Sequence, residues 1–234
     1  MENKEAVIGE NVARIREEIA RNAEASGRCE SDITLIAVCK YVDSEITGLV
    51  VRQGCHDVGE NRPQTLWNKA AELGSLPVRF HQIGHLQRNK VRRTVGLISL
   101  LHAGDSLRLL RSVSEESVKQ EISTNILLEV NLSGDEAKHG FAHSEVNRII
   151  DEVARMHNIK VCGLMGMAGL KSDASQTARE YESLRTLRDK LQRNSGGNVE
   201  LSELSMGMSR DYGLAIQQGA TMVRVGSALF HGLV

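Results

Sequence analysis

Short apolar, β-branched runs alternate with longer segments of helical periodicity from residue 34 to the end of the chain. Candidate strands lie at residues 34–39, 56–58, 79–83, 97–102, 125–131, 160–165, 200–205 and 221–225. Candidate helices lie near residues 43–53, 62–73, 86–95, 105–120, 142–157, 176–194 and 211–218. Such alternation indicates parallel strands joined by right-handed helical crossovers, and eight repeats close a barrel. The pattern predicts an α/β fold, a single (β/α)8 TIM barrel, with an open doubly wound sheet as the alternative.

An amphipathic helix is predicted ahead of the first strand. Ile8, Val12, Ile15 and Ile19 recur at helical spacing between charged residues, which is not the pattern of a targeting sequence. The chain has 234 residues and two prolines, and no Pro-, Gly- or Ser-rich linker marks a boundary. We therefore expect one domain over residues 1–234, a barrel with an extra N-terminal helix.

Composition argues against several classes of partner. A formal net charge of −1 gives no general attraction to nucleic acid or to an anionic membrane, so any anion site must be local. The four cysteines form no CxxC pair, which predicts reduced thiols in the cytoplasm and no structural metal. One predicted helix carries a basic stretch, Arg88, Lys90, Arg92 and Arg93. Because no aromatic residues are interleaved with it, a solvated helix face is favoured over a nucleic-acid site.

A lysine ends the first predicted strand, TLIAVCK (34–40). Alternation along a strand puts Ile36, Val38 and Lys40 on one face and Cys39 on the other. An amine at the inward end of a barrel strand is placed for imine chemistry with an aldehyde. The alternative is a lysine that extends to solvent from the strand end, and this strand taken alone favours that alternative.

The last predicted strand, TMVRVGSALF (221–230), indicates an anion site. Arg224 lies within it, and Gly226, Ser227 and Ala228 are predicted to enter a helix whose first backbone N–H groups are free to bind an anion. Barrel phosphate sites commonly use the loops after the last two strands. Together with the lysine at the first strand, this site favours a phosphorylated aldehyde, and pyridoxal phosphate in particular.

Three further polar residues follow predicted strands. Ser209, in the turn SMGMSRDYG (205–213), offers a hydroxyl to an anion, and helix capping by Ser209 or Asp211 is the alternative. Asn61 and His81 could hydrogen-bond a cofactor ring or satisfy buried structural groups. No GxGxxG follows an early strand, so the sequence does not predict a dinucleotide site.

Seven segments spread over nearly the whole chain carry a further signal. They are AVCK (37–40), VGEN (58–61), FHQIGHLQRNK (80–90), EVNLSGDEAKHG (129–140), GLMGM (163–167), LSMGMSRD (204–211) and MVRVGSALFHG (222–232). In this order they resemble the YggS/PROSC family of pyridoxal-phosphate-binding homeostasis proteins, which is related in barrel fold to the N-terminal domain of alanine racemase. The chain departs from the family pattern at Cys39, Arg210, Ser227 and His231.

The resemblance implies a role for each site residue. Lys40 would hold pyridoxal phosphate as a Schiff base, and Arg224 would face the pyridine nitrogen. The phosphate would be held by Ser209, Gly226 and Ser227, and the ring would be lined by Asn61, His81 and Met206. Because a guanidinium only donates hydrogen bonds, Arg224 would leave the ring nitrogen unprotonated and the ring a weak electron sink.

The expected function follows from that weak electron sink and from the length of the chain. Alanine racemase-like enzymes add a second domain and a tyrosine from the partner subunit. This chain has no length for that domain, and alternation turns Tyr41 away from Lys40. The resemblance therefore implies a cytoplasmic, monomeric homeostasis protein with little or no turnover, whose partners are pyridoxal phosphate and apo enzymes that use it. An amino-acid racemase and a cofactor-free barrel for phosphorylated metabolites are the alternatives.

Overall fold

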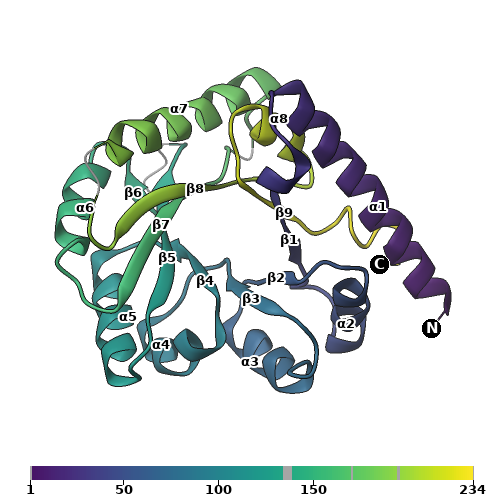
Figure 1. Ribbon diagram of the computed structural model, residues 1–234, viewed down its shortest axis with the longest axis horizontal. Helices are drawn as coiled ribbons and strands as arrows, with labels where there is room; N and C mark the ends of the chain where they lie inside the picture. Colours follow the sequence, from purple (N-terminus) through teal and green to yellow (C-terminus); the bar gives the residue numbers. More distant parts are fainter. Residues whose placement is uncertain (1, 134–138, 170, 194–195, 234) are drawn as a thin grey trace.

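Parallel strands close into a barrel that is surrounded by helices (Figure 1). The computed structural model describes residues 2–133, 139–169, 171–193 and 196–233. The barrel strands are β1 (Thr34–Val38), β2 (Asp57–Glu60), β3 (Arg79–Gln82), β4 (Leu100–Gly104), β5 (Thr124–Asn131), β7 (Ile159–Gly166), β8 (Val199–Met208) and β9 (Met222–Val225). Pairing of β1 with β9 closes the ring. The predicted (β/α)8 barrel is confirmed, and each predicted strand overlaps one of these.

A further strand of two residues, β6 (Phe141–Ala142), is missing from the sequence prediction. It pairs in parallel with Val130 and Asn131 at the end of β5. Two residues are too few to show the alternation that marks a strand, so no local pattern could indicate it. It forms because the end of β5 offers free backbone groups beside it.

The outer ring consists of helices that each follow a strand. They are α2 (Ser44–Arg52), α3 (Pro63–Glu72), α4 (Arg88–Thr94), α5 (Leu107–Lys119), α6 (Val146–Val153), α7 (Ala174–Gln192) and α8 (Tyr212–Gln217), with 3-10 turns at Glu30–Asp32 and Val95–Leu97. Asp43, Ser106 and Asp173 cap three of them by accepting a hydrogen bond from a backbone N–H three residues on. The cap and the apolar face of each helix are both local features, which is why these helices were predictable.

The expected N-terminal helix is α1 (Glu2–Ala25), which packs beside α8 outside the ring (Figure 1). Its apolar stripe of Ile8, Val12, Ile15 and Ile19 is at most 4% exposed. Burial of one such side chain stabilises a fold by about 1.5–3 kcal/mol, so α1 is an integral part of this one.

The chain after β9 does not form the helix that the sequence predicts. Residues 227–233 form turns, in which the N–H of Leu229 donates to the carbonyl of Gly226. The side-chain amide of Asn11, from α1, donates to the carbonyls of Leu229 and His231 at 3.1 and 2.9 Å. Contact with α1 thus engages carbonyls that a continuing helix would have used itself.

The apolar core has two parts, and strand alternation decides which side chain enters which. The larger part lies between barrel and helices and includes Ala37, Cys39 and Met206. A smaller cluster inside the barrel contains Leu100, Ala103, Leu127 and Met165. The interior also holds the polar side chains of His81, His102, Ser205 and Arg224, which lead to the site described below.

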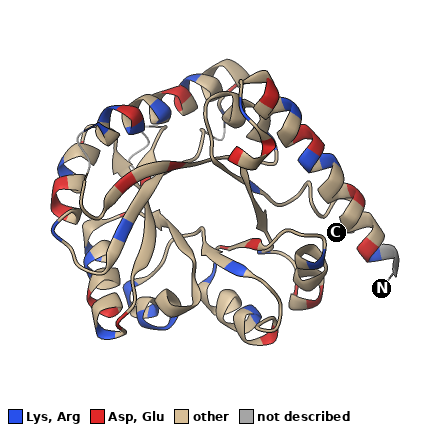
Figure 2. Cartoon of the chain, viewed as in Figure 1, with Lys and Arg blue, Asp and Glu red and all other residues tan. Residues whose placement is uncertain are grey.

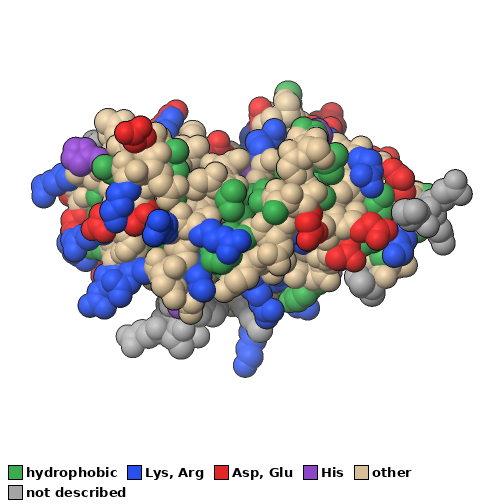
Figure 3. All heavy atoms as spheres, turned by 90° about the horizontal axis from the view of Figure 1, so that it is seen from below, with side chains coloured by type: hydrophobic (Ala, Val, Ile, Leu, Met, Phe, Trp, Pro, Cys, Tyr) green, Lys and Arg blue, Asp and Glu red, His purple; other side chains and the backbone are tan. Residues whose placement is uncertain are grey.

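Charged residues lie mainly on the outer helices (Figure 2). On the face seen from below in Figure 3, Lys and Arg side chains are interspersed with Asp and Glu. The basic stretch on α4 is partly engaged within the fold, because the guanidinium of Arg93 lies 4.3 Å from the centroid of the Trp67 ring. Within the described ranges, no helix combines the length and the apolar character that a membrane crossing requires.

Candidate functional site

Three neighbouring strand ends bring the predicted site residues to one mouth of the barrel. Strand β9 pairs with β1 on one side and with β8 on the other, and Ile36 and Met208 both lie opposite Arg224. Lys40 follows the end of β1, and Gly226 follows the end of β9. Parallel strands end at the same face, so both residues lie at the carboxyl mouth, where barrels carry their functional groups.

Alternation predicts that Lys40 faces inward, and its neighbours fit that prediction. Ala37 and Cys39 pack in the core between barrel and helices, on the face opposite to the one predicted for Lys40. Cys39 is fully buried in that core, so this departure from the family pattern points away from the mouth, and burial raises the pKa of its thiol to about 12. Lys40 is half-buried, and its amine has no ion-pair partner among the described residues. The amine lies 4.9 Å from the centroid of the exposed Tyr41 ring.

A buried ion pair fixes the strand end that carries Lys40. The ammonium of Lys69, on α3, donates to the Glu60 carboxylate at 2.5 Å and to the Cys39 carbonyl at 2.8 Å. Glu60 is fully buried and Lys69 is 2% exposed. Burial raises the pKa of the Glu60 carboxyl, against the opposing effect of the Lys69 ammonium. The pair joins α3, the end of β2 and the end of β1 at the peptide preceding Lys40.

The turns after β8 and β9 contact each other and leave hydrogen-bond donors free. The N–H of Gly226 donates to the Ser209 hydroxyl at 3.1 Å, so Ser209 does not cap α8. The amides of Ser227 and Ala228 donate to no acceptor among the described residues. A side chain at Gly226 would place its Cβ 3.3 Å from the Cβ of Val38. The φ of Gly226 is not positive, so close approach to β1, and not backbone conformation, favours glycine there.

Arg224 projects into the barrel, where it is 5% exposed. One guanidinium nitrogen donates to the Ser205 hydroxyl at 2.5 Å and the other terminal nitrogen to the Gly166 carbonyl at 3.0 Å. It forms no ion pair with a described carboxylate. Burial lowers the pKa of the Arg224 guanidinium, although such a group stays protonated in proteins. Two of its five N–H donors are engaged in these bonds, which leaves three for a ligand.

A chain of hydrogen bonds connects Arg224 to the opposite end of the barrel. Ser205 contacts His102 at 2.9 Å, His102 contacts His81 at 2.9 Å, and His81 contacts Asp57 at 3.0 Å. Burial alone would raise the pKa of Asp57, but hydrogen bonds from His81 and Arg79 outweigh it and lower the pKa to about 2. Asp57 is therefore ionised and only accepts, so the Nε2 of His81 carries a proton.

The positions of the other protons in this series of hydrogen bonds follow from the same donor and acceptor rules. Burial lowers the pKa of His102 well below 6.5, so its ring is neutral. When the Ser205 hydroxyl donates to the Nδ1 of this neutral ring, its Nε2 donates to the Nδ1 of His81. Each group from Arg224 to Asp57 then donates to the next, and the arginine is held by a series of groups with satisfied hydrogen bonds.

Three predicted ring-lining residues have different environments. Met206 is fully buried in the core between barrel and helices, because it alternates with the inward Ser205. His81 uses both ring nitrogens inside the barrel. Asn61 remains at the mouth, where its backbone carbonyl accepts a hydrogen bond from the Gln82 side-chain amide at 3.1 Å. The structure therefore brings Lys40 and Asn61 to the same mouth as the predicted phosphate-binding residues, whereas Met206 lies in the core between barrel and helices. All ligand contacts remain predictions.

The sequence did not predict which groups hold Arg224. Ser205 and His102 lie on inward positions of β8 and β4, so alternation within those strands could have indicated them. Glu129, on β5, was also missed. Burial first, and the charge of Asp105 second, raise the pKa of the Glu129 carboxyl to about 7, against smaller opposite effects of Arg224 and His85.

Comparison with known proteins gives a consistent result. Residues 67–233 match the family described as alanine racemase, N-terminal domain. A pyridoxal phosphate homeostasis protein of Aquifex aeolicus is 35% identical over 221 residues, which are 94% of this chain and 96% of that protein. The chain belongs to the family of pyridoxal phosphate homeostasis proteins. The resemblance in the seven segments is thereby confirmed, although residues 134–138 of the segment EVNLSGDEAKHG, with Lys138, lie outside the described residues.

Solved structures agree with this assignment. PipY of Synechococcus elongatus PCC7942, solved with PLP bound, superposes with a TM-score of 0.84 at 29% identity, and the match covers 95% of this chain and 99% of that one. An alanine racemase of Clostridium difficile superposes with a TM-score of 0.73 at 13% identity, a likeness of fold alone. That match covers 92% of this chain but 58% of the racemase.

Proposed function

We propose that this protein binds pyridoxal phosphate at the carboxyl mouth of its barrel and takes part in the homeostasis of that cofactor. The observation that carries the proposal is the buried Arg224 guanidinium, which has no carboxylate partner among the described residues and has three unused donors. Buried N–H donors without an acceptor are costly, and a bound ligand can supply that acceptor. The solved PLP complex of PipY, a full-length relative, supports the same ligand.

The residues at the mouth fit this cofactor. The free amides of Ser227 and Ala228 and the hydroxyl of Ser209 match a phosphate group. The amine of Lys40 can add to the aldehyde carbon, with loss of water, to give a Schiff base. The bound cofactor supplies an aldehyde and an electron-accepting ring, and Arg224 donates toward the ring nitrogen and so limits electron withdrawal.

We further propose that the protein carries and delivers the cofactor with little or no turnover. Of its three tyrosines, Tyr212 is engaged elsewhere, because its hydroxyl donates to Glu18 of α1 at 2.5 Å, and Tyr181 is fully buried on α7. Apo enzymes that use pyridoxal phosphate are the recipients in this proposal. The four unpaired cysteines support its placement in the reducing cytoplasm.

Amino-acid racemisation is the second candidate, and Tyr41 is the observation that favours it. The Tyr41 ring is 83% exposed and lies 4.9 Å from the Lys40 amine, so this tyrosine is at the mouth although strand alternation predicts that it turns away. A racemase needs a second acid or base beside the lysine. We rank this function second because Tyr41 lies next to Lys40 and not across the mouth from it.

Borohydride trapping tests the first proposal. The protein is loaded with pyridoxal phosphate, reduced and digested, and the labelled peptide is identified by mass spectrometry. We expect the label on Lys40, and we expect Lys40→Ala to lose both the label and the imine absorption band. Lys90→Ala, a variant on α4, is the matched control and should keep both. A label on another lysine, with normal cofactor binding by Lys40→Ala, would overturn the assignment.

A further inference from the structure

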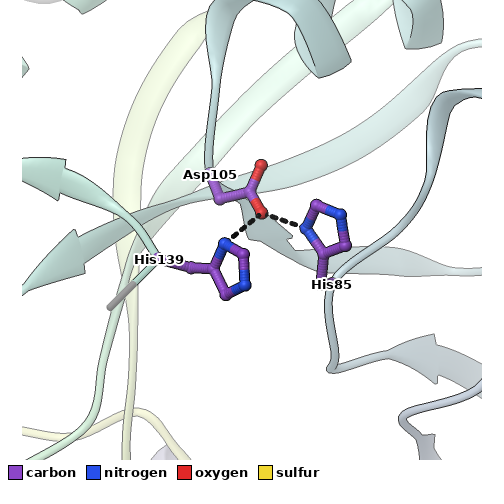
Figure 4. A group of neighbouring side chains, drawn as sticks. All are labelled: His85, Asp105 and His139. Carbon is purple, nitrogen blue, oxygen red and sulfur yellow. Dashed lines mark hydrogen bonds and ion pairs between the residues drawn. The ribbon is translucent and has the colours of Figure 1, made fainter. Parts of the chain in front are cut away.

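Two histidines and an aspartate from three separate segments meet at the same mouth of the barrel (Figure 4). His85 follows β3, Asp105 directly follows β4, and His139 precedes β6. One ligand atom from each, a ring nitrogen of either histidine and a carboxylate oxygen, lies within 4.8 Å of the other two. We propose that these residues form a site for a divalent transition-metal ion such as Zn²⁺, although the sequence predicts no metal.

The orientation of the two rings supports a shared ligand. Their centroids are 4.7 Å apart and their planes differ by 16°. Both Nδ1 atoms are directed at the same Asp105 oxygen, at 2.5 Å for His85 and 3.8 Å for His139 (Figure 4). One carboxylate oxygen accepts a good hydrogen bond from His85 alone, so the approach of a second, stacked imidazole is not explained by that bond. A cation between the three atoms accounts for all of them.

The charge around Asp105 favours a cation. Its side chain is 3% exposed, and its second oxygen, Oδ1, is buried without a hydrogen-bond partner. An unsatisfied buried carboxylate oxygen is costly. Glu129 is a second buried carboxyl group, and its side chain packs against Gly140, the residue after His139. A bound divalent ion would compensate both groups and could use Oδ1 as a ligand atom.

The donor set selects the class of metal. Two imidazole nitrogens and one carboxylate oxygen suit zinc and similar divalent transition ions, whereas calcium and magnesium prefer oxygen ligands. Ligand atoms around a tetrahedral zinc at about 2.0–2.2 Å are about 3.3 Å apart. The two contacts with Asp105, at 2.5 and 3.8 Å, therefore need to change by less than about 1 Å, and the two imidazole nitrogens, which lie within 4.8 Å, by at most about 1.5 Å. The side chains of His85 and His139 are 45% and 65% exposed, which leaves them room to adjust.

Zinc binding by the full chain, stripped with a chelator and free of any affinity tag, tests this site. Competition with a chromophoric chelator measures stoichiometry and affinity, and Co²⁺ reports ligand number through its visible absorption. We expect one ion per chain. The variants Asp105→Asn and His85→Ala/His139→Ala should lose at least about tenfold in affinity, the size of loss seen even when outer-shell partners of metal ligands are removed. His143→Ala, which removes another exposed histidine nearby, is the matched control and should bind like the wild type.

Each outcome either supports or contradicts a metal site at His85, Asp105 and His139. Far-UV circular dichroism and the urea midpoint of each variant establish that it is folded. If the wild type binds no zinc, or if the double histidine variant binds it equally well, the site does not exist. Binding of magnesium or calcium in preference to zinc would also overturn the assignment. None of these measurements depends on pyridoxal phosphate, so failure here and failure of the proposed function are distinct results.

Discussion

Replacing Lys69 by methionine should destabilise the protein strongly, because it removes the cation of the buried pair behind Lys40. The methionine keeps most of the side-chain volume, so the loss comes mainly from polar groups left without a partner. The Glu60 carboxylate, which is fully buried, loses its counter-charge, and the Cys39 carbonyl loses a donor. Breaking one partner of a buried pair typically costs about 3–5 kcal/mol. We expect a loss of about 4 kcal/mol, a large share of the roughly 5–15 kcal/mol that holds a domain folded.

Urea unfolding followed by circular dichroism measures this loss. The double variant Glu60→Leu/Lys69→Met removes both charges, and it should recover to within about 1.5 kcal/mol of the wild type, since an apolar pair can replace a buried ion pair. Burial raises the pKa of Glu60, so its protonated form is favoured in the fold, and stability is lost as pH rises through that pKa. The deficit of Lys69→Met should therefore be smaller at pH 5 than at pH 8.

Two results would contradict this reasoning. A loss below about 1 kcal/mol for Lys69→Met would mean that water reaches Glu60 and that the pair behaves like a surface ion pair. Equal losses in the single and double variants would mean that packing of the Lys69 chain, and not its charge, stabilises the fold.

The other predictions concern the mouth and the interior of the barrel. Gly226→Val should release the cofactor on dialysis at nearly unchanged thermal stability, because its Cβ would lie 3.3 Å from the Cβ of Val38; wild-type retention would place the phosphate elsewhere. Asp57→Asn should lower the free energy of unfolding at pH 7 by about 2 kcal/mol, since its folded pKa of about 2 lies below the ordinary 3.8. That penalty should fade only as pH falls from about 4 toward 2, so a penalty that shrinks between pH 7 and 5 in urea unfolding contradicts the assignment. Amino-acid α-proton exchange into deuterated water, followed by NMR, should be slow with the loaded protein, and fast exchange lost in both Lys40→Ala and Tyr41→Phe would favour the racemase.

Much of the fold and part of the site could be predicted from the sequence, because both depend on local periodicity. Alternation along β1 is a property of five or six consecutive residues, and it correctly placed Cys39 against the helices. The same rule would have placed Met206 outward, since Ser205 beside it faces the interior. The family resemblance, which carries no geometry, assigned Met206 to the ring instead.

The sequence by itself determined the barrel, the N-terminal helix and the ends of β1 and β9, because the spacing of apolar residues and the alternation of side chains along a strand depend on neighbouring residues alone. Only the tertiary structure decided what those ends meet. The partners of Arg224 on β7 and β8 and the meeting of His85, Asp105 and His139 join residues from separate strands and loops. Such contacts exist only once the ring has closed, because closure fixes which strand ends become neighbours. The turn after β9 has the same cause, since α1 must dock before Asn11 can engage the carbonyls there.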